Sequence, residues 1–106
     1  MSRPPLAREK VLDAFEALLI GEGERGSTLD ATARAAGVSK GGLLYHFASK
    51  EALEQALLDR LHVLVDADVA ATAAAPEGPI AYFVRTSVMN DDALDRALLA
   101  VARLAQ

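Results

Sequence analysis

The sequence predicts an all-α protein, and three observations lead to this fold class. Alanine and leucine are abundant, and no run of Val, Ile or Thr resembles a strand. Apolar residues recur at helical spacing in several segments. Between these segments stand Ser, Thr, Gly and Pro, the residue types that begin and end helices. The chain has 106 residues, of which 52% are hydrophobic, so it has the size of one domain with enough apolar residues for a packed core.

A first helix is predicted from residue 6 to about residue 22. Its apolar face consists of Val11, Leu12, Phe15, Leu18 and Leu19. Gly21 and Gly23 are expected to end the helix, so that the stretch GEGERGS forms a loop. Residues 2–5, before the helix, are expected to form a flexible arm. Arg3 in this arm is interpreted as a solvated tail charge, with a phosphate contact as the alternative.

Two short helices with a tight turn between them are predicted next. Thr28 is a suitable N-cap for a helix over residues 29–36, and Gly37 stands where a helix end favours a left-handed residue. Ser39 is a second N-cap, opening a helix over residues 40–47. Two helices joined by a short turn that contains glycine form a helix-turn-helix, whose second helix can enter the major groove of DNA.

The second of these helices has an unusual composition. Gly41 and Gly42 each cost about 1 kcal/mol relative to alanine, which suggests that the helix backbone must approach another surface closely. Lys40 would contact a base edge or a phosphate, or else be a solvated cation. Tyr45 and His46 can donate to phosphate oxygens, the alternative being a half-buried ring and a satisfied histidine. The residues expected in the core are Leu43, Leu44 and Phe47.

A longer helix and two further helices complete the prediction. Ser49 can cap a helix that begins at Lys50 and runs about 20 residues, to near Ala71. A cation at a helix N-terminus opposes the helix dipole, and a nearby phosphate would explain Lys50 there. The stretch AAAPEGP interrupts the pattern. Helices are then predicted over residues 80–89 and 93–106. The inward positions of the last helix would be Leu94, Leu98, Val101 and either Leu104 or Ala105.

Charge and composition narrow the function classes. The net charge is −4, but residues 1–50 hold seven Lys/Arg against six Asp/Glu, whereas residues 51–106 hold four against nine. The first half is therefore the expected DNA-facing half, because local cations steer association more than whole-chain charge. The chain has no Cys, and His62 has no second His at a metal-ligand spacing, so we expect no metal and no cofactor. No apolar run suits a signal peptide or a membrane span, which favours the cytoplasm.

The segment GVSKGGLLYHFASKEAL resembles the DNA-binding region of the tetracycline-repressor-like (TetR) family of bacterial regulators. The similarity rests on three short motifs, which are GVS at residues 37–39, YHF at residues 45–47 and SKE at residues 49–51. It extends over about residues 6–60. The family often has a Tyr where this chain has Leu44, and Tyr45 is expected to take over its phosphate contact. Family members are also usually about twice as long as this chain.

The resemblance implies a helix-turn-helix DNA-binding domain at residues 1–49. Residues 50–106 would form a connecting helix and the start of an incomplete helical regulatory and dimerisation domain. The implied function is a ligand-responsive repressor that binds a palindromic double-stranded DNA operator as a homodimer. The expected DNA contacts are Thr28, Ser39, Lys40, Gly41, Gly42, Tyr45, His46 and Lys50. The site for a small-molecule effector would be lined by His62, Tyr82, Phe83 and Met89. In the alternative interpretation, the aromatic residues and Met89 are ordinary core residues.

Two other function classes are alternatives to DNA binding. A helical protein-interaction module could keep the helix-turn-helix for packing alone, but it would not need a small, basic and aromatic surface on the second helix. For an enzyme, Asp30, Ser39 and His46 could be named as a triad. The sequence has no Gly-x-Ser-x-Gly turn and no second polar cluster, so we do not expect an enzyme.

Overall fold

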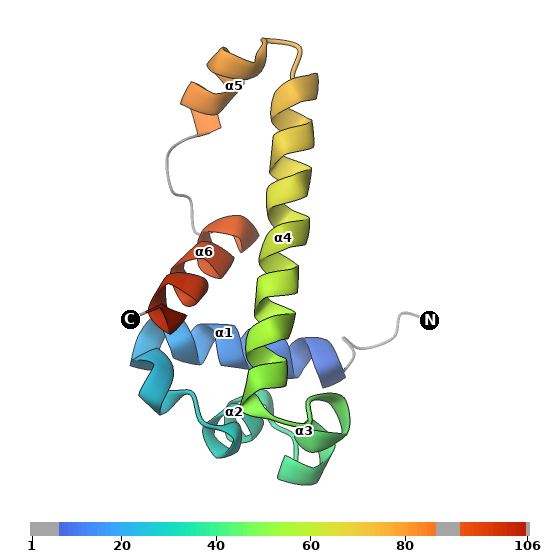
Figure 1. The fold of residues 1–106 in the computed structure, drawn as a ribbon, viewed down its shortest axis with the longest axis vertical. Helices are drawn as coiled ribbons and strands as arrows, with labels where there is room; N and C mark the ends of the chain where they lie inside the picture. Colours follow the sequence, from blue (N-terminus) through green and yellow to red (C-terminus); the bar gives the residue numbers. More distant parts are fainter. Residues whose placement is uncertain (1–6, 87–91, 106) are drawn as a thin grey trace.

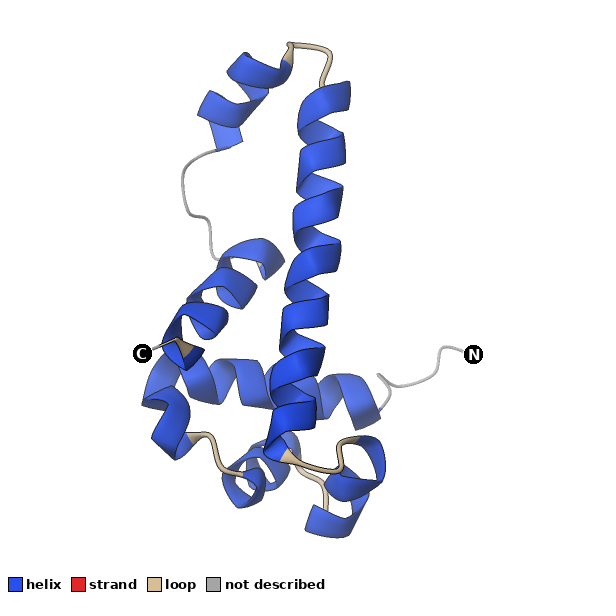
Figure 2. Cartoon of the chain, in the orientation of Figure 1, coloured by secondary structure: helices blue, strands red, loops and turns tan. Residues whose placement is uncertain are grey.

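The computed structural model describes residues 7–86 and 92–105, and these ranges contain six helices and no strand (Figure 2). The all-α prediction is therefore confirmed. The helices are α1 (Ala7–Gly26), α2 (Leu29–Ala36), α3 (Lys40–His46), α4 (Lys50–Ala74), α5 (Pro79–Thr86) and α6 (Ala93–Leu104). Arg3 and the rest of the arm predicted at residues 2–5 lie outside the described residues, as does Met89.

The first helix is interrupted at Gly23, where its end was predicted. Gly23 has φ 80° and ψ −177°, a backbone conformation that essentially only glycine adopts. The chain then makes one more helical turn, to Gly26, so the prediction of a loop over residues 21–27 is wrong. A single glycine in this conformation redirects the helix without unwinding it. The buried Ser27 hydroxyl donates to the Gly23 carbonyl at 2.7 Å and holds the kink closed.

Side-chain caps set the boundaries of the next helices as the sequence predicts. The Thr28 hydroxyl accepts from the N–H of Ala31 at 3.0 Å, and the Ser49 hydroxyl accepts from the N–H of Ala52 at 3.1 Å. Gly37 ends α2 with φ 73°, in the left-handed region. Each cap satisfies a backbone group that the helix itself leaves unpaired. Local chemistry therefore defines this part of the fold.

A 25-residue helix, α4, connects the small N-terminal helices to α5 at its far end, and α6 returns to pack against α1 and α4 (Figure 1). The break after Ala75 lies where AAAPEGP predicts it. Pro79 becomes the first residue of α5, a position where the missing N–H has no cost. The Asp92 carboxylate caps α6 by accepting from the N–H of Asp95 at 2.9 Å. In the ranges described, no helix combines the length and apolar character needed to cross a membrane.

One continuous core joins α1, α2, α3, α4 and α6. Its buried members are Val11, Leu12, Phe15, Leu19, Ala33, Leu43, Phe47, Leu53, Ala56, Leu57 and Ala100. The inward face predicted for α6 is partly wrong, because Leu98 is 43% exposed while Ala97 and Ala100 are fully buried. Small side chains let α6 approach its neighbours closely, so the larger Leu98 is displaced to the edge of the contact.

Candidate nucleic-acid interface

The outer surface of α3 is polar and aromatic, and the helix is anchored from behind. Leu43 and Phe47 are buried one turn apart and hold α3 on the core. Tyr45 is 85% exposed, and its ring meets that of His46 edge-on, with centroids 5.0 Å apart. Leu44 was predicted as core, and this is wrong, since it is 39% exposed. A seven-residue helix has one buried stripe, and Leu44 lies beside the stripe that Leu43 and Phe47 define.

The two glycines of α3 differ in their surroundings. A Cβ added at Gly41 would meet nothing within 4 Å, so the backbone there is open to an approaching partner. A Cβ added at Gly42 would lie 3.2 Å from the Ser39 hydroxyl, which accepts from the Gly42 N–H at 3.0 Å. Gly42 therefore fits tightly against the cap. The absence of a side chain at Gly41 has no such internal explanation.

The first turns of α2 and α3 lie close together. The ammonium of Lys40 forms an ion pair with the Asp30 carboxylate at 3.2 Å, and both side chains are more than half exposed. Thr28 and Ser39, the exposed caps of these helices, use their oxygens as acceptors, so their O–H groups remain able to donate. The structure thus brings four of the predicted contact residues, Thr28, Ser39, Lys40 and Gly41, to adjoining helix starts.

Lys50 has an internal partner. Its ammonium donates to both the backbone carbonyl and the carboxylate of Glu24, each at 2.8 Å. This hydrogen bond, together with the Lys50 charge, holds the pKa of Glu24 below its ordinary value. A phosphate near Lys50 was expected because a cation at a helix N-terminus opposes the helix dipole. Glu24 already supplies that negative charge, so the phosphate contact of Lys50 stays a prediction.

Three of the four residues predicted to line an effector site lie in the part of the chain that the structure describes, and these three do not converge. His62 is exposed on α4. Tyr82 is half-buried in α5, with the guanidinium of Arg85 lying 5.1 Å from its ring centre. Phe83 is 66% exposed and borders a groove of about 360 Å³ between α4 and α5. His62 and Tyr82 are not among the residues that line this groove.

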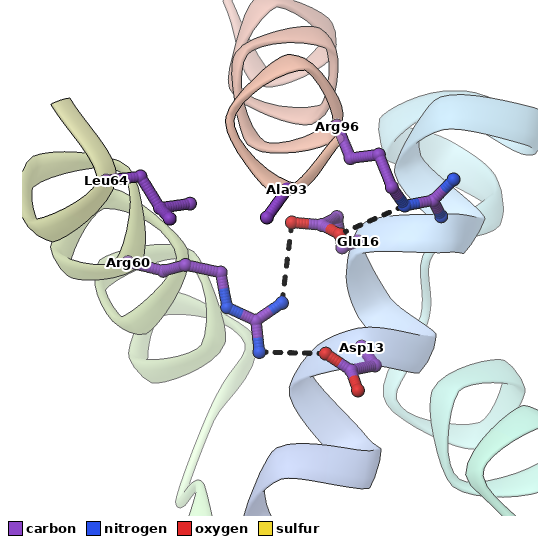
Figure 3. A pocket seen from close by; sticks show the side chains of 6 residues that line it. All are labelled: Asp13, Glu16, Arg60, Leu64, Ala93 and Arg96. Carbon is purple, nitrogen blue, oxygen red and sulfur yellow. Dashed lines mark hydrogen bonds and ion pairs between the residues drawn. The ribbon is translucent and has the colours of Figure 1, made fainter. Parts of the chain in front are cut away.

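A charged cavity of about 520 Å³ between α1, α4 and α6 was not predicted (Figure 3). Arg60 is one of the residues that line it and lies 2.9 Å from Asp13 and 3.4 Å from Glu16, while Arg96 lies 3.5 Å from Glu16. Burial alone would lower the pKa of Arg60, but bonds and charges from Asp13 and Glu16 outweigh burial and raise it. The spacing of Glu9, Asp13 and Glu16 along one helical stripe is the signal that could have revealed this site.

Residues 11–57 match the family model described as bacterial regulatory proteins, tetR family. The matched range runs from the first half of α1 through α2 and α3 into α4, and so contains the interface described above. No group of acidic or imidazole side chains within the described ranges could hold a metal ion.

Two curated relatives from Pseudomonas putida share 38% identity with this chain over 58 residues, or 54% of its length. They are the HTH-type transcriptional regulator SrpR and the uncharacterized HTH-type transcriptional regulator TtgW. The match spans 27% of the first and 43% of the second, well under two thirds of either protein. No solved structure matches the chain significantly. The region that contains the interface, residues 11–57, is therefore similar to the tetR family of bacterial regulatory proteins.

Proposed function

We propose that this chain is a sequence-specific DNA-binding transcriptional regulator in which α3 enters the major groove. The observation that carries the proposal is the outer surface of α3, where Tyr45 is 85% exposed and the Gly41 backbone is open. Leu43 and Phe47 fix this helix from the opposite side, so its exposed face is rigidly presented. Both curated relatives are named as helix-turn-helix transcriptional regulators.

The proposed contacts divide into two roles. Lys40, Tyr45 and His46 would donate to base edges or phosphate oxygens, and Gly41 would let the backbone approach the groove. The remaining contacts would position the helices on phosphates through hydroxyl and ammonium donors and helix N-termini, and they are Thr28, Ser39, Gly42 and Lys50. In this arrangement Lys50 would exchange or share its bond with Glu24 when a phosphate arrives.

The acidic second half of the chain bears on which side of the protein faces DNA. Residues 51–106 carry four Lys/Arg against nine Asp/Glu, so duplex DNA would be repelled from α5, α6 and the part of α4 beyond Lys50. Residues 1–50 carry a small positive excess, seven against six. We therefore expect a modest salt dependence, set by the few cations of the first half rather than by a large basic surface.

A finer proposal concerns assembly and control. We propose two units, a DNA-binding domain at residues 1–49 and the start of a regulatory and dimerisation domain at residues 50–106. One α3 supplies few base contacts, so operator-level affinity calls for a homodimer on a palindromic site, with half-sites about 34 Å apart per helical turn. The strongly exposed apolar residues that favour self-association are Val63, Val69, Ile80, Phe83 and Val84. A small-molecule effector in the groove beside Phe83 would move α4 and release the operator, which makes the chain a ligand-responsive repressor.

The test begins with selection of a binding site by the purified chain from a pool of randomised duplexes. We expect one sequence to be enriched, to bind more tightly than a scrambled duplex, and to lose that preference when Tyr45 is changed to alanine. Gln55→Ala is the matched control, because this exposed α4 side chain bonds Asp59 within its own helix at 3.0 Å. Equal binding to all duplexes, or none, would contradict the proposal and favour a helical protein-interaction module.

A further inference from the structure

The kink in α1 is held by side chains from two helices that are distant in sequence. Gly23 adopts a conformation restricted to glycine, and the backbone immediately afterwards leads into Thr28, the cap of α2. Ser27 closes the kink from within, through its hydroxyl bond to the Gly23 carbonyl at 2.7 Å. The direction in which α2 leaves α1 therefore depends on the geometry of this short segment.

On the upstream side, the holding group is Arg103 from the last turn of α6. Its Nε donates at 3.2 Å to the carbonyl of Leu19, which lies four residues before Gly23. A Cβ added at Gly23 would lie 2.9 Å from Nη2 of Arg103 and 3.6 Å from Cζ. The guanidinium therefore lies against the bare Cα of Gly23, in space that any side chain there would occupy.

On the downstream side, the holding group is Lys50 from the first turn of α4. Its ammonium donates at 2.8 Å to the carbonyl of Glu24, the residue directly after Gly23, and at 2.8 Å to the Glu24 carboxylate. The same carbonyl accepts from the N–H of Ser27 at 3.2 Å. Lys50 thus joins the kink in α1 to the start of α4, the helix that follows α3.

We propose that Arg103 is a positioning residue for DNA binding, which fixes the Gly23 kink and thereby the placement of α2, α3 and the start of α4. Arg103 touches no DNA in this proposal and acts through Leu19 and Gly23. The position of α6 then sets the orientation of α3 through α1. The inference rests on the proposed function, since it assigns Arg103 a role in that activity.

In this proposal, a change in the position of α6 reaches α3 through α1, and no pivoting of α4 is needed. A displacement of α6 by one hydrogen-bond length would break the bond from Arg103 to Leu19 and leave Gly23 without its covering group. The Ser27 and Lys50 bonds would then hold the kink alone. The first amides of α2 lie directly downstream, so loss of Arg103 should loosen them before it affects α5.

The experiment uses the whole 106-residue chain and the duplex selected from the randomised pool. Arg103→Ala is compared with Arg103→Lys, which keeps one donor for the Leu19 carbonyl. Arg85→Ala is the matched control, because this arginine pairs with Glu77 in α5 through bonds of 2.7 and 3.1 Å. Affinity is measured on folded protein at a temperature well below each midpoint of unfolding, and amide hydrogen exchange is followed without DNA.

We expect Arg103→Ala to weaken duplex binding by about twofold to thirtyfold, the range typical of residues that couple distant sites. Amides of residues 24–32 should exchange faster, Arg103→Lys should recover most of the affinity, and Arg85→Ala should change neither quantity. When Arg103→Ala is combined with Glu24→Gln, the fold-loss of duplex affinity should be less than the product of the two single fold-losses, because both changes release the same kink.

Unchanged exchange at residues 24–32 in Arg103→Ala, or an affinity equal to that of Arg85→Ala, would overturn the inference. If Arg103→Ala does not fold, Arg103→Lys and Arg103→Gln supply the same comparison. A chain that binds no duplex would refute the proposed function, whereas the exchange measurement would still decide whether Arg103 holds the kink.

Discussion

The guanidinium of Arg60 in α4 lies 3.4 Å from the carboxylate of Glu16 in α1, whose side chain is 7% exposed. Because Arg96 in α6 lies 3.5 Å from the same carboxylate, one buried acid joins three helices (Figure 3). Loss of the Glu16 charge would therefore remove one ion pair from Arg60 and one from Arg96. Glu16 thus links α1 to α4 and α6.

Glu16→Gln should lower the free energy of unfolding by about 1–3 kcal/mol, because two guanidinium groups lose a buried charged acceptor. Asp13→Asn is the matched control. Asp13 also pairs with Arg60, at 2.9 Å, but its side chain is 68% exposed, so its loss should cost less than about 1 kcal/mol. Urea unfolding of the two variants and the unsubstituted chain measures both values. Equal losses would show that burial of Glu16 adds nothing to the pair.

Glu24 predicts a pH dependence of stability. Lys50 holds the folded-state pKa of Glu24 below its ordinary value of 4.5. A depressed carboxyl pKa contributes stability above the unfolded-state pKa, and that contribution is lost as pH falls through the folded-state value. The stability advantage of the unsubstituted chain over Glu24→Gln should therefore be constant near neutrality and shrink below about pH 4.5. Unfolding curves at a series of pH values test this. A gap that widens on acidification would reverse the assigned sign.

Substitutions at the two glycines of α3 should affect stability and DNA binding differently. Gly41→Ala should stabilise the folded chain by up to about 1 kcal/mol, because the site is open and alanine favours helix. The same change should weaken duplex binding, since a methyl group would stand between the backbone and the groove. Gly42→Ala should stabilise less, because its Cβ would press on the Ser39 hydroxyl at 3.2 Å. Thermal unfolding and duplex titration of both variants give the comparison. Tighter binding by Gly41→Ala would contradict the proposed close approach.

How far the sequence predicted the structure depended on whether the signal was local. Thr28, Gly37, Ser39 and Ser49 fix helix boundaries through bonds to neighbouring backbone, so the boundaries they predict are confirmed. The exposure of Leu44 and Leu98 depends on how helices pack, which periodicity alone leaves ambiguous by one position. The partners of Lys50 and Arg60 lie 26 and at least 44 residues away, and no local pattern specifies such pairs.

Lys50 provides a test of phosphate contact that its bond to Glu24 makes sharper. Lys50→Gln removes the charge and keeps a donor for the Glu24 carbonyl. If Lys50 contacts a phosphate, this change should reduce the slope of log affinity against log salt by about one unit and weaken all duplexes alike. Glu24→Gln should leave the slope intact, because the ammonium remains. Filter binding at several salt concentrations measures both slopes. A loss confined to one operator variant would argue for base recognition instead.

The exposed face of α5 predicts self-association. Ile80, Phe83 and Val84 are 82%, 66% and 65% exposed, and their spacing places them on one face of the helix. In an isolated chain this apolar face would be exposed to water, which is unfavourable. Phe83→Lys should shift the chain to monomer at micromolar concentration, because an ammonium group cannot be buried without a partner. Phe83 is 66% exposed in the single chain, so the monomer itself should remain folded.

Leu99→Lys is the matched control for this substitution, because Leu99 is 45% exposed on α6 and lies outside the α5 face. Sedimentation should give a dimer for the unsubstituted chain and for Leu99→Lys, and a monomer for Phe83→Lys. Binding to a palindromic duplex should then change from two chains per site to one, with a large loss of affinity, since each half-site contributes only a few base contacts. A monomer that binds the full palindrome tightly, one chain per site, would refute the requirement for a dimer.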